Sequence, residues 1–511
     1  MFLKKTKIRS KEEEQANTEN SQCIGELLAK AKKSSDFKQF PLRDESGQLI
    51  ISYYNTLIDQ QQLQLKILLG FRDRPYELAK LEKIDDIKKM IPIEDIVITD
   101  NIKEAESKLL KGYAILQMRE NDQRFALILL SNEKVGLREQ NNVENEFSVV
   151  GPQVGFVENI DVNIHLLRQQ LNTSNLTIKE INVGAISHTR VIIAYIEGVT
   201  NEQHVNTMTQ RLRDIDFDVV FDSSQLHLLI TDNSITPFPL LLSTERIDRA
   251  VFALINGQVA VFSNGSSFAI TGPSTLLDFF ISPEDYLLPW IIASLFRLIR
   301  IFSVLFSIFA TSIYIVVLTY HYEVIPDVLF GALSYSRHNV PFPPVIEVLF
   351  LEFTIELLRE AGARLPTKVG QTLGIVGGIV VGQAAVEAAL TSNVLLIIVA
   401  LSALASFTTP IYKMSNTIRF LRFPLIIVAS IWGGLGIVLG ISFLIVHLTR
   451  LESLGTPYTV PLYPFRRQDL ADSFIRSSYN LTSKRLSYLR PKSIWRYQPH
   501  NHKRKKNEFD E

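Results

Sequence analysis

Cysteine is almost absent from this 511-residue chain, in which Cys23 stands alone. A single thiol excludes an internal disulfide framework and a cysteine-based metal site. Net charge is also missing, because 53 Lys and Arg balance 53 Asp and Glu, and the composition gives no general attraction to nucleic acid. The opening residues, MFLKKTKIRSKEEE, lack the apolar run of a secretory signal peptide. We therefore expect the N-terminal region to stay in the cytoplasm.

Catalytic signatures are lacking as well. The sequence has no phosphate-cradling GxxxxGK[ST], no HExxH zinc motif and no GxSxG nucleophile elbow. The histidines of the first half have no metal-ligand spacing, and we interpret each as a core or surface residue: His165, His188, His204 and His227. We expect no enzyme activity, no bound metal and no cofactor.

The first half of the chain predicts an α+β cytoplasmic region in two subdomains. Residues 1–39 are charged and are expected to be disordered. A first mixed α/β subdomain follows at 40–150, where YAILQM and FALILL are typical of a hairpin of buried strands. A second, α/β subdomain with hairpins spans 151–285. Its Asn-Gly pairs at 256–257 and 264–265 each predict a tight hairpin turn.

The second half predicts an α-helical polytopic membrane domain. Residues 286–300 form an interfacial segment in which Tyr286 and Trp290 suit the bilayer interface, and Arg297 and Arg300 are long enough to reach headgroups. About four spans follow within residues 301–450, each near the ~20 residues that cross the hydrocarbon: 301–320, 369–389, 394–412 and 423–448. Residues 451–511 are predicted to be a basic, solvated cytoplasmic tail that touches anionic lipid.

Four spans keep the tail in the cytoplasm but place a basic loop outside, against the positive-inside rule. That loop carries Lys413, Arg419 and Arg422. If a further helix crosses, the loop moves inside and the tail moves outside. We keep four spans, and the side of this loop stays open.

A Glu-rich helix at 344–360 lies between the first two spans, and its apolar run is too short and too charged for an ordinary span. We predict a broken or re-entrant helix with three intramembrane acids: Glu347, Glu352 and Glu356. Ionisable groups at membrane depth are functional candidates by default. A structural network that pairs Glu356 with Arg359, or Glu360 with Arg364, is an equal alternative to an ion path.

Glycines four residues apart run through the second predicted span: Gly370, Gly374, Gly378 and Gly382. On a helix they form one ridge without side chains, which lets another backbone approach closely in a bilayer. The opposite face holds the candidate pore-lining residues: Thr372, Val376, Ile379, Val380, Gln383 and Glu387. In several packed copies this face could line a path with a hydrophobic constriction near Ile379 and a carboxylate at one mouth. The alternative is that the apolar stripe faces lipid and the polar ends bond neighbouring helices.

The chain resembles the A subunit of GerA-type spore germinant receptors from endospore-forming bacteria over about residues 151–457. The similarity is carried by PFPPVIEVLFLEFTIELLREAGARLP, VGQTLGIVGGIVVGQAAVEAAL, GPQVGFVENIDVNIHLLRQQL and ISPEDYLLPWIIASLFRLIR, and by SALASFTTPIY and RFLRFPLIIVAS. The resemblance implies an integral protein of the inner spore membrane, with its soluble region and tail on the core side. It also implies a transporter-like B subunit that binds the germinant, and a lipoprotein C subunit, as partners.

The resemblance further implies self-association into a ring that forms a germinant-gated channel and releases monovalent cations at the start of germination. A non-conducting scaffold or signalling subunit of the same receptor is the alternative. A secondary transporter is weaker, because no internal repeat of spans is visible.

Overall fold

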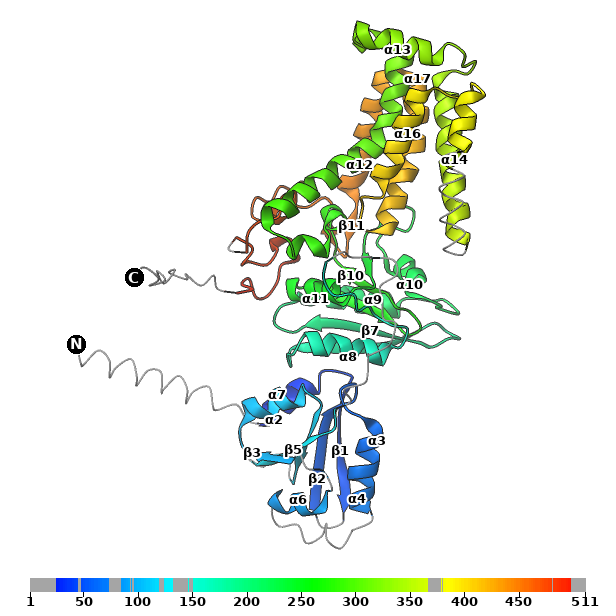
Figure 1. Cartoon of the computed structure of the whole chain (residues 1–511). Helices are drawn as coiled ribbons and strands as arrows, with labels where there is room; N and C mark the ends of the chain where they lie inside the picture. The colour runs from blue at the N-terminus through cyan, green and yellow to red at the C-terminus, as the bar shows by residue number, and fades with distance from the viewer. Residues whose placement is uncertain are drawn as a thin grey trace, which may run out of the picture.

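The computed structural model describes residues 24–44, 47–72, 84–91, 93, 96–118, 124–131, 146, 150–365, 378, 380–479 and 481–497. Figure 1 shows three parts in series, namely two sheet-containing units and a bundle of long helices. The chain therefore has the predicted order, in which an α+β region precedes a helical region.

The first unit is built on a five-stranded antiparallel sheet of order β1-β2-β4-β5-β3. Its strands are β1 (Phe37–Asp44), β2 (Gly47–Tyr54), β3 (Ile96–Thr99), β4 (Tyr113–Gln117) and β5 (Phe125–Leu129). Its helices are α2 (Ile24–Ala31), α3 (Gln60–Gln62), η1 (Leu63–Leu68), α4 (Leu69–Arg72), η2 (Ile84–Asp86), α6 (Ile87–Met90) and α7 (Ile102–Leu109). Pairing of β4 with β5 confirms the predicted hairpin.

The unit begins earlier than the sequence suggested. Residues 24–39 were expected to be disordered, but they form α2 and the start of β1. The reason is a short apolar stripe: Ile24, Leu28 and Ala31 are buried in the core shared with α7 and β5. Charged residues around this stripe concealed it in the composition.

The second unit has another antiparallel five-stranded sheet, of order β6-β7-β9-β10-β8. Its strands are β6 (Leu176–Val183), β7 (Thr189–Ile196), β8 (Leu242–Thr244), β9 (Val259–Ser263) and β10 (Ala269–Gly272). One apolar core contains α8 (Ile160–Gln170) and α11 (Ile247–Asn256), and another contains α9 (Glu202–Arg213) and α10 (Ser223–Ile230). The helices therefore cover both faces of the sheet.

Only one of the two Asn-Gly pairs makes a hairpin. The pair at 264–265 lies between the antiparallel strands β9 and β10, as predicted. The prediction for 256–257 was wrong, because Asn256 ends helix α11 and Gly257 caps it with φ 100°. A glycine with positive φ serves a helix C-terminus as well as a turn, so the dipeptide alone does not distinguish them.

A buried ion pair connects the two units. The Arg168 guanidinium on α8 binds the Asp36 carboxylate through Nε and Nη2 at 2.6 and 2.7 Å, and it stacks on the Tyr54 ring. Nearby, the backbone N–H of Ser35 donates to the carbonyl of Ile178 at 2.8 Å. Burial would raise the pKa of Asp36, but the charge and hydrogen bonds of Arg168 outweigh it and hold that pKa below 3.8.

The bundle consists of α12 (Trp290–Thr319), α13 (Asp327–Arg337), α14 (Pro344–Arg364), a helical stretch at 380–387, α16 (Asn393–Ser406) and α17 (Tyr412–Arg450), with η5 (Tyr322–Val324) between α12 and α13. Among the described residues, α12 and α17 are long and apolar enough to cross a membrane, and α16 is a shorter apolar helix. Figure 1 places α13 at the end of the bundle farthest from the sheets.

Helix α17 is a hairpin of two antiparallel arms. Its 39 residues would extend about 58 Å in a straight helix. Instead, Gly433 departs from helical geometry with φ 60° and ψ −137°, and a Cβ on Gly440 would lie 2.6 Å from Leu425. A Cβ on Gly436 would collide with the backbone of Val428. Contacts between residues 8 and 15 positions apart require the chain to reverse at Gly433.

The far end and the base of the bundle can be recognised from its contacts. At the far end, the Tyr314 hydroxyl lies 3.1 Å from that of Ser392, and Tyr320 donates to the carbonyl of Ser430 at 2.6 Å, beside the reversal. At the base, Thr417 donates to the carbonyl of Pro237 at 2.5 Å. Helix α16 therefore runs back toward the base, and both ends of α17 lie there.

Among the described residues, the chain goes out along α12, back along α14 and, after Ser392, back along α16, and then out and back in α17 (Figure 1). The expected span 423–448 was wrong, because it combines parts of two arms. The Glu-rich segment is not broken, because α14 is one continuous helix of 21 residues, roughly 31 Å long.

The tail after α17 is folded onto the second unit, as far as residue 497. It contains β11 (Glu452–Ser453), β12 (Thr456–Pro457), η6 (Asp469–Asp472) and η7 (Ser487–Leu489). The Ser453 and Tyr458 hydroxyls donate to the carbonyls of Leu240 and Pro239 at 2.6 and 2.9 Å, and Arg485 donates to that of Ile255 at 2.7 Å. The expectation of a solvated tail was therefore wrong for this stretch.

Candidate functional site

The described part of the glycine helix separates a packed face from an outward face. Gly382 is buried, and a Cβ there would touch the Leu396 side chain of α16 at 3.6 Å. Val380 is 57% exposed, and the exposed Gln383 amide donates to the Glu387 carboxylate at 3.0 Å. The predicted pore face at these three positions therefore points away from the rest of its own chain.

The glycine ridge does not pack uniformly. Gly378 is exposed, and a Cβ there would have no atom within 4 Å. The other ridge and pore candidates lie outside the described residues: Gly370, Gly374, Thr372, Val376 and Ile379. Space for another backbone against this helix therefore exists at Gly378 and is already filled by α16 at Gly382.

Glu352 takes part in a buried ion pair at the centre of the bundle. Its carboxylate on α14 accepts a hydrogen bond from Arg422 on α17. The same guanidinium donates to the Ser307 hydroxyl on α12 at 2.8 Å and to the Ser402 carbonyl on α16 at 3.5 Å. One arginine thus joins four helices, and Arg422 is placed inside the bundle and not in an external loop.

The other three acids of α14 are also paired. Glu347 is buried and accepts from Arg337 of α13 at 2.7 Å. Glu356 pairs with Arg359 one turn later, and Glu360 pairs with Arg364 at 2.5 Å. The structure therefore contains the ion-pair network that was the alternative to an ion path along α14.

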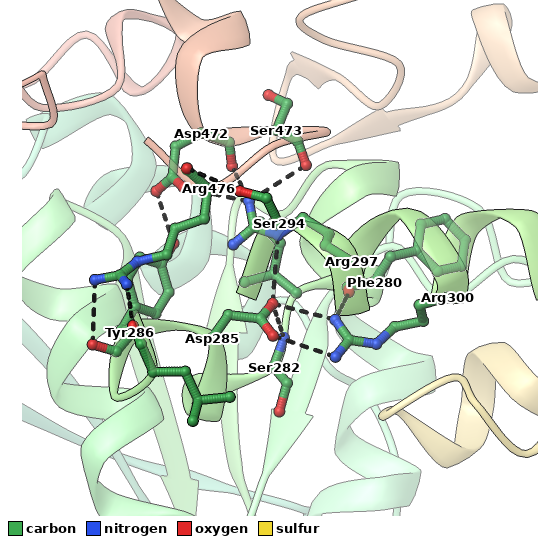
Figure 2. Close-up of polar contacts among 12 residues, drawn as sticks. Phe280, Ser282, Asp285, Tyr286, Ser294, Arg297, Arg300, Asp472, Ser473 and Arg476 are labelled. Carbon is green, nitrogen blue, oxygen red and sulfur yellow. Dashed lines mark hydrogen bonds and ion pairs between the residues drawn. The ribbon is translucent and has the colours of Figure 1, made fainter. Parts of the chain in front are cut away.

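A second cluster of charges lies at the base, where three chain segments meet (Figure 2). We call Asp285, Arg297, Arg300 and Asp472 the base cluster. Asp285 belongs to η4 (Pro283–Tyr286), which follows η3 (Leu276–Phe280); the two arginines are on α12, and Asp472 is in the tail. Arg297 reaches Asp285 at 3.3 Å and the Asp472 carboxylate at 3.2 Å, and Arg300 makes two contacts with Asp285 at 3.1 and 3.2 Å.

Backbone and tyrosine contacts complete this junction. Arg297 also donates to the carbonyl of Asp472 at 2.6 Å, and the Tyr286 hydroxyl donates to the Asp472 carboxylate at 2.8 Å. Burial raises the pKa of Asp472, and the charge of Arg297 only partly opposes this. The prediction that Arg297 and Arg300 reach lipid headgroups was wrong, because both guanidinium groups are paired within the protein. Arg297 pairs with Asp285 and Asp472, and Arg300 pairs with Asp285.

Sequence reasoning missed the base cluster because Asp472 is 175 positions from Arg297. The sequence did hold one signal. An arginine inside an apolar helix needs a partner for its charge, and Asp285 lies only twelve residues before Arg297. A cavity of about 820 Å³ lies beside the cluster, between α11 and the tail, and is lined by residues such as Arg249, Asp278 and Tyr488.

Two histidines of the soluble half, His165 and His227, are held by backbone carbonyls. The ring of His165 bonds the Thr56 carbonyl at 2.9 Å, and that of His227 bonds the Leu241 carbonyl at 2.9 Å. Burial, with Lys413 nearby, lowers the pKa of His227 to about 4, so its ring is neutral at physiological pH. Among the described residues, no group of three His, Cys, Asp or Glu side chains is arranged to hold a metal.

Comparison with known proteins gives consistent matches. The model of the Bacillus/Clostridium GerA spore germination protein family matches residues 24–488. Spore germination protein GerQA of Bacillus cereus is 46% identical over 96% of this chain and 97% of its own length. Spore germination protein A1 of Bacillus subtilis is 38% identical over 83% of this chain and 86% of its own.

One solved structure is similar to part of the chain. It is the N-terminal domain of the A subunit of the Bacillus megaterium spore germinant receptor GerK3, which is 22% identical. The match covers 49% of this chain and 92% of that one, with a TM-score of 0.36.

Proposed function

Because the chain belongs to the GerA family of spore germination proteins, as a germinant receptor subunit, we propose that its copies assemble into a germinant-gated ion channel. The channel would release monovalent cations from the spore at the start of germination. The observation that carries this proposal is the outward face of the glycine helix, where Val380, Gln383 and Glu387 lie exposed on a single chain. A closed path along this face requires further copies, which would surround it with equivalent faces.

The proposed location is the inner spore membrane, with the soluble units and the tail on the core side. The contacts of α12 and α17 at the base support this arrangement, because the chain enters the bundle at the base along α12 and leaves it there at the end of α17. The base then carries the basic residues Lys413 and Arg419, in agreement with the positive-inside rule. If α14 and both arms of α17 cross the membrane, as we propose, the conflict that arose with four predicted spans is removed.

The proposed partners are a transporter-like B subunit that binds the germinant, a lipoprotein C subunit, membrane lipid and further copies of this chain. Nucleic acid is not among them, since the net charge is zero. The germinant would bind to the B subunit, and this chain would respond to it.

The specific alternative is a non-conducting scaffold of the same receptor. It is favoured by the pairing of Glu347, Glu352 and Glu356, which engages the acids of α14 in ion pairs that hold the bundle together. A secondary transporter has less support, since no repeat of the spans is visible in the sequence.

Cation flux from liposomes that contain the purified chain with its partner subunits distinguishes the two. The channel predicts germinant-dependent flux, which Ile379→Ser makes independent of germinant by polarising the constriction. Glu387→Gln should reduce cation over anion preference, whereas Glu360→Gln, at an exposed pair, should not. Absence of flux in every state would favour the scaffold, and normal germinant-dependent gating of Ile379→Ser would contradict the pore assignment.

A further inference from the structure

The loop between α10 and β8 reaches the helices of the bundle. Its Thr236 hydroxyl lies 2.9 Å from the His447 ring on the returning arm of α17, and the Pro237 carbonyl accepts from Thr417 on the outgoing arm at 2.5 Å. Thr417 is five residues into α17, which corresponds to roughly 7 Å along the helix. The loop is therefore held at the level of the first turns of the bundle.

The side chain before these contacts is apolar and uncovered. Ile235 is 92% exposed, in a loop where the backbone N–H of residue 235 is bonded to the Asn233 side chain at 2.9 Å. A single exposed apolar residue is ordinary on a protein surface, so its meaning depends on whether the apolar surface around it is contiguous. Its position next to two anchored residues means that the side chain is presented in one direction.

The apolar surface continues from the loop to the helices. A hollow of about 390 Å³ separates α10 from α17 and is lined by Leu228 and Phe420, which are 59% and 58% exposed. Above it, Phe443 stacks beside the His447 ring on the outward side of α17. The loop is thus the lower end of an apolar strip that extends up the outside of a membrane-spanning hairpin.

Charge contributes little to this surface. Asp232, at the start of the loop, is paired with Arg211 at 2.6 Å. Lys413 is the cation in the hollow, and its ammonium is directed to the Ser243 hydroxyl at 3.3 Å. A partner recognised here would therefore be apolar and not a strongly anionic surface.

We propose that the Ile235 loop inserts into the interfacial zone of the bilayer and anchors the second sheet unit to the membrane. The occupant is lipid, since the strip is continuous with the outer face of α17 and lies at the depth where that hairpin enters the bundle. This anchoring does not depend on channel activity. It would fix the tilt of the sheet relative to the membrane through the two hydrogen bonds to α17.

A depth-sensitive label tests the proposal, and the single cysteine of the chain makes the labelling specific. The full chain with Cys23→Ser and Ile235→Cys is labelled with NBD and reconstituted in phosphatidylcholine nanodiscs. The matched control is Leu65→Cys, a 66% exposed apolar position in the first unit. Figure 1 shows this unit at the opposite end of the molecule from the bundle. We expect nitroxide on the lipid to quench most of the fluorescence at position 235 and none at 65.

Measurements on the same two labelled variants can also contradict the proposal. Equal quenching by aqueous iodide at both positions would place the loop in water and overturn the proposal. Protection of position 235 from both iodide and lipid nitroxide would identify a protein partner, such as a second copy, and would also overturn it. Lipid quenching that persists in 1 M salt supports apolar insertion, and its loss in salt would contradict it.

Discussion

The base cluster makes a quantitative prediction about how the tail is held against α12. In Arg297→Met, the Asp472 carboxylate loses its cation while the tail still packs beside it. Removal of one partner of a buried pair costs about 3–5 kcal/mol, because the other charge stays buried without compensation. Arg297 fits this case, since its side chain is fully buried and Asp472 is only 16% exposed.

Hydrogen–deuterium exchange of the full chain in nanodiscs measures this cost locally. Loss of 3–5 kcal/mol accelerates exchange of amides that depend on tail opening by roughly a hundredfold to several thousandfold, at 1.4 kcal/mol per factor of ten. The amides to follow are those of Asp469 and Ser473, whose N–H groups donate to the carbonyls of Arg466 and Leu470 in the tail at 3.1 and 3.2 Å. The matched control is Arg364→Met, which breaks an exposed pair worth about 0.2–1 kcal/mol.

A double variant separates the charge effect from simple loss of contact. With Arg297→Met, Asp472→Leu replaces the stranded carboxylate by an apolar group, while Asp285 keeps its two contacts with Arg300. Apolar replacement of a whole buried pair is often neutral. We therefore expect the double variant to recover most of the lost protection. Two results would refute this reasoning. In one, the tail amides of Arg297→Met exchange no faster than those of the Arg364→Met control. In the other, they exchange as fast in the double variant as in Arg297→Met.

Three further predictions concern the rest of the molecule. Gly436→Ala should destabilise the α17 hairpin by about 1–3 kcal/mol through overpacking, whereas Gly331→Ala, with open space around its Cβ, should be neutral or stabilising; thermal unfolding in detergent compares them. Glu352→Gln alone should lower the midpoint more than Glu352→Leu with Arg422→Met, because only the single change leaves a buried charge, and equal losses would argue against pairing. The contact of Asp36 is present above pH 3.8 and lost as the pH falls through its depressed folded pKa, so acid should accelerate exchange in β1, and Asp36→Asn should abolish that dependence.

The sequence predicted best what depends on neighbouring residues. The β4–β5 hairpin and the turn at 264–265 have strand patterns and turn residues within one short stretch. The same local reasoning separated Gly382 from Gln383 and Glu387 on the glycine helix, because helical periodicity needs no knowledge of the fold.

Features that depend on distant residues were not predictable in this way. The reversal at Gly433 lies inside a continuous apolar run, and only contacts such as Gly440 with Leu425 reveal it. The roles of Arg297 and Arg422 were also unpredictable from neighbouring residues, because each pairs with a carboxylate from a distant segment of the chain. An arginine in an apolar helix predicted a need for a partner, but not whether lipid, water or protein would supply it.

The contacts divide the bundle into two parts. We call α12 and α17, which are bonded to the soluble unit or the tail, the frame, and the glycine helix packs outside it. Among the described residues, α12 and α17 are bonded to the soluble unit or the tail at their bases, through Arg297, Thr417 and His447. The described part of the glycine helix contacts α16 at Gly382 and makes no such bond. Motion of the soluble unit would therefore be transmitted first to α12 and α17, and the Arg422–Glu352 pair would carry it to α14. A gate on the glycine helix would open by movement relative to this frame, which requires the frame to stay intact while the Gly382–Leu396 contact slides.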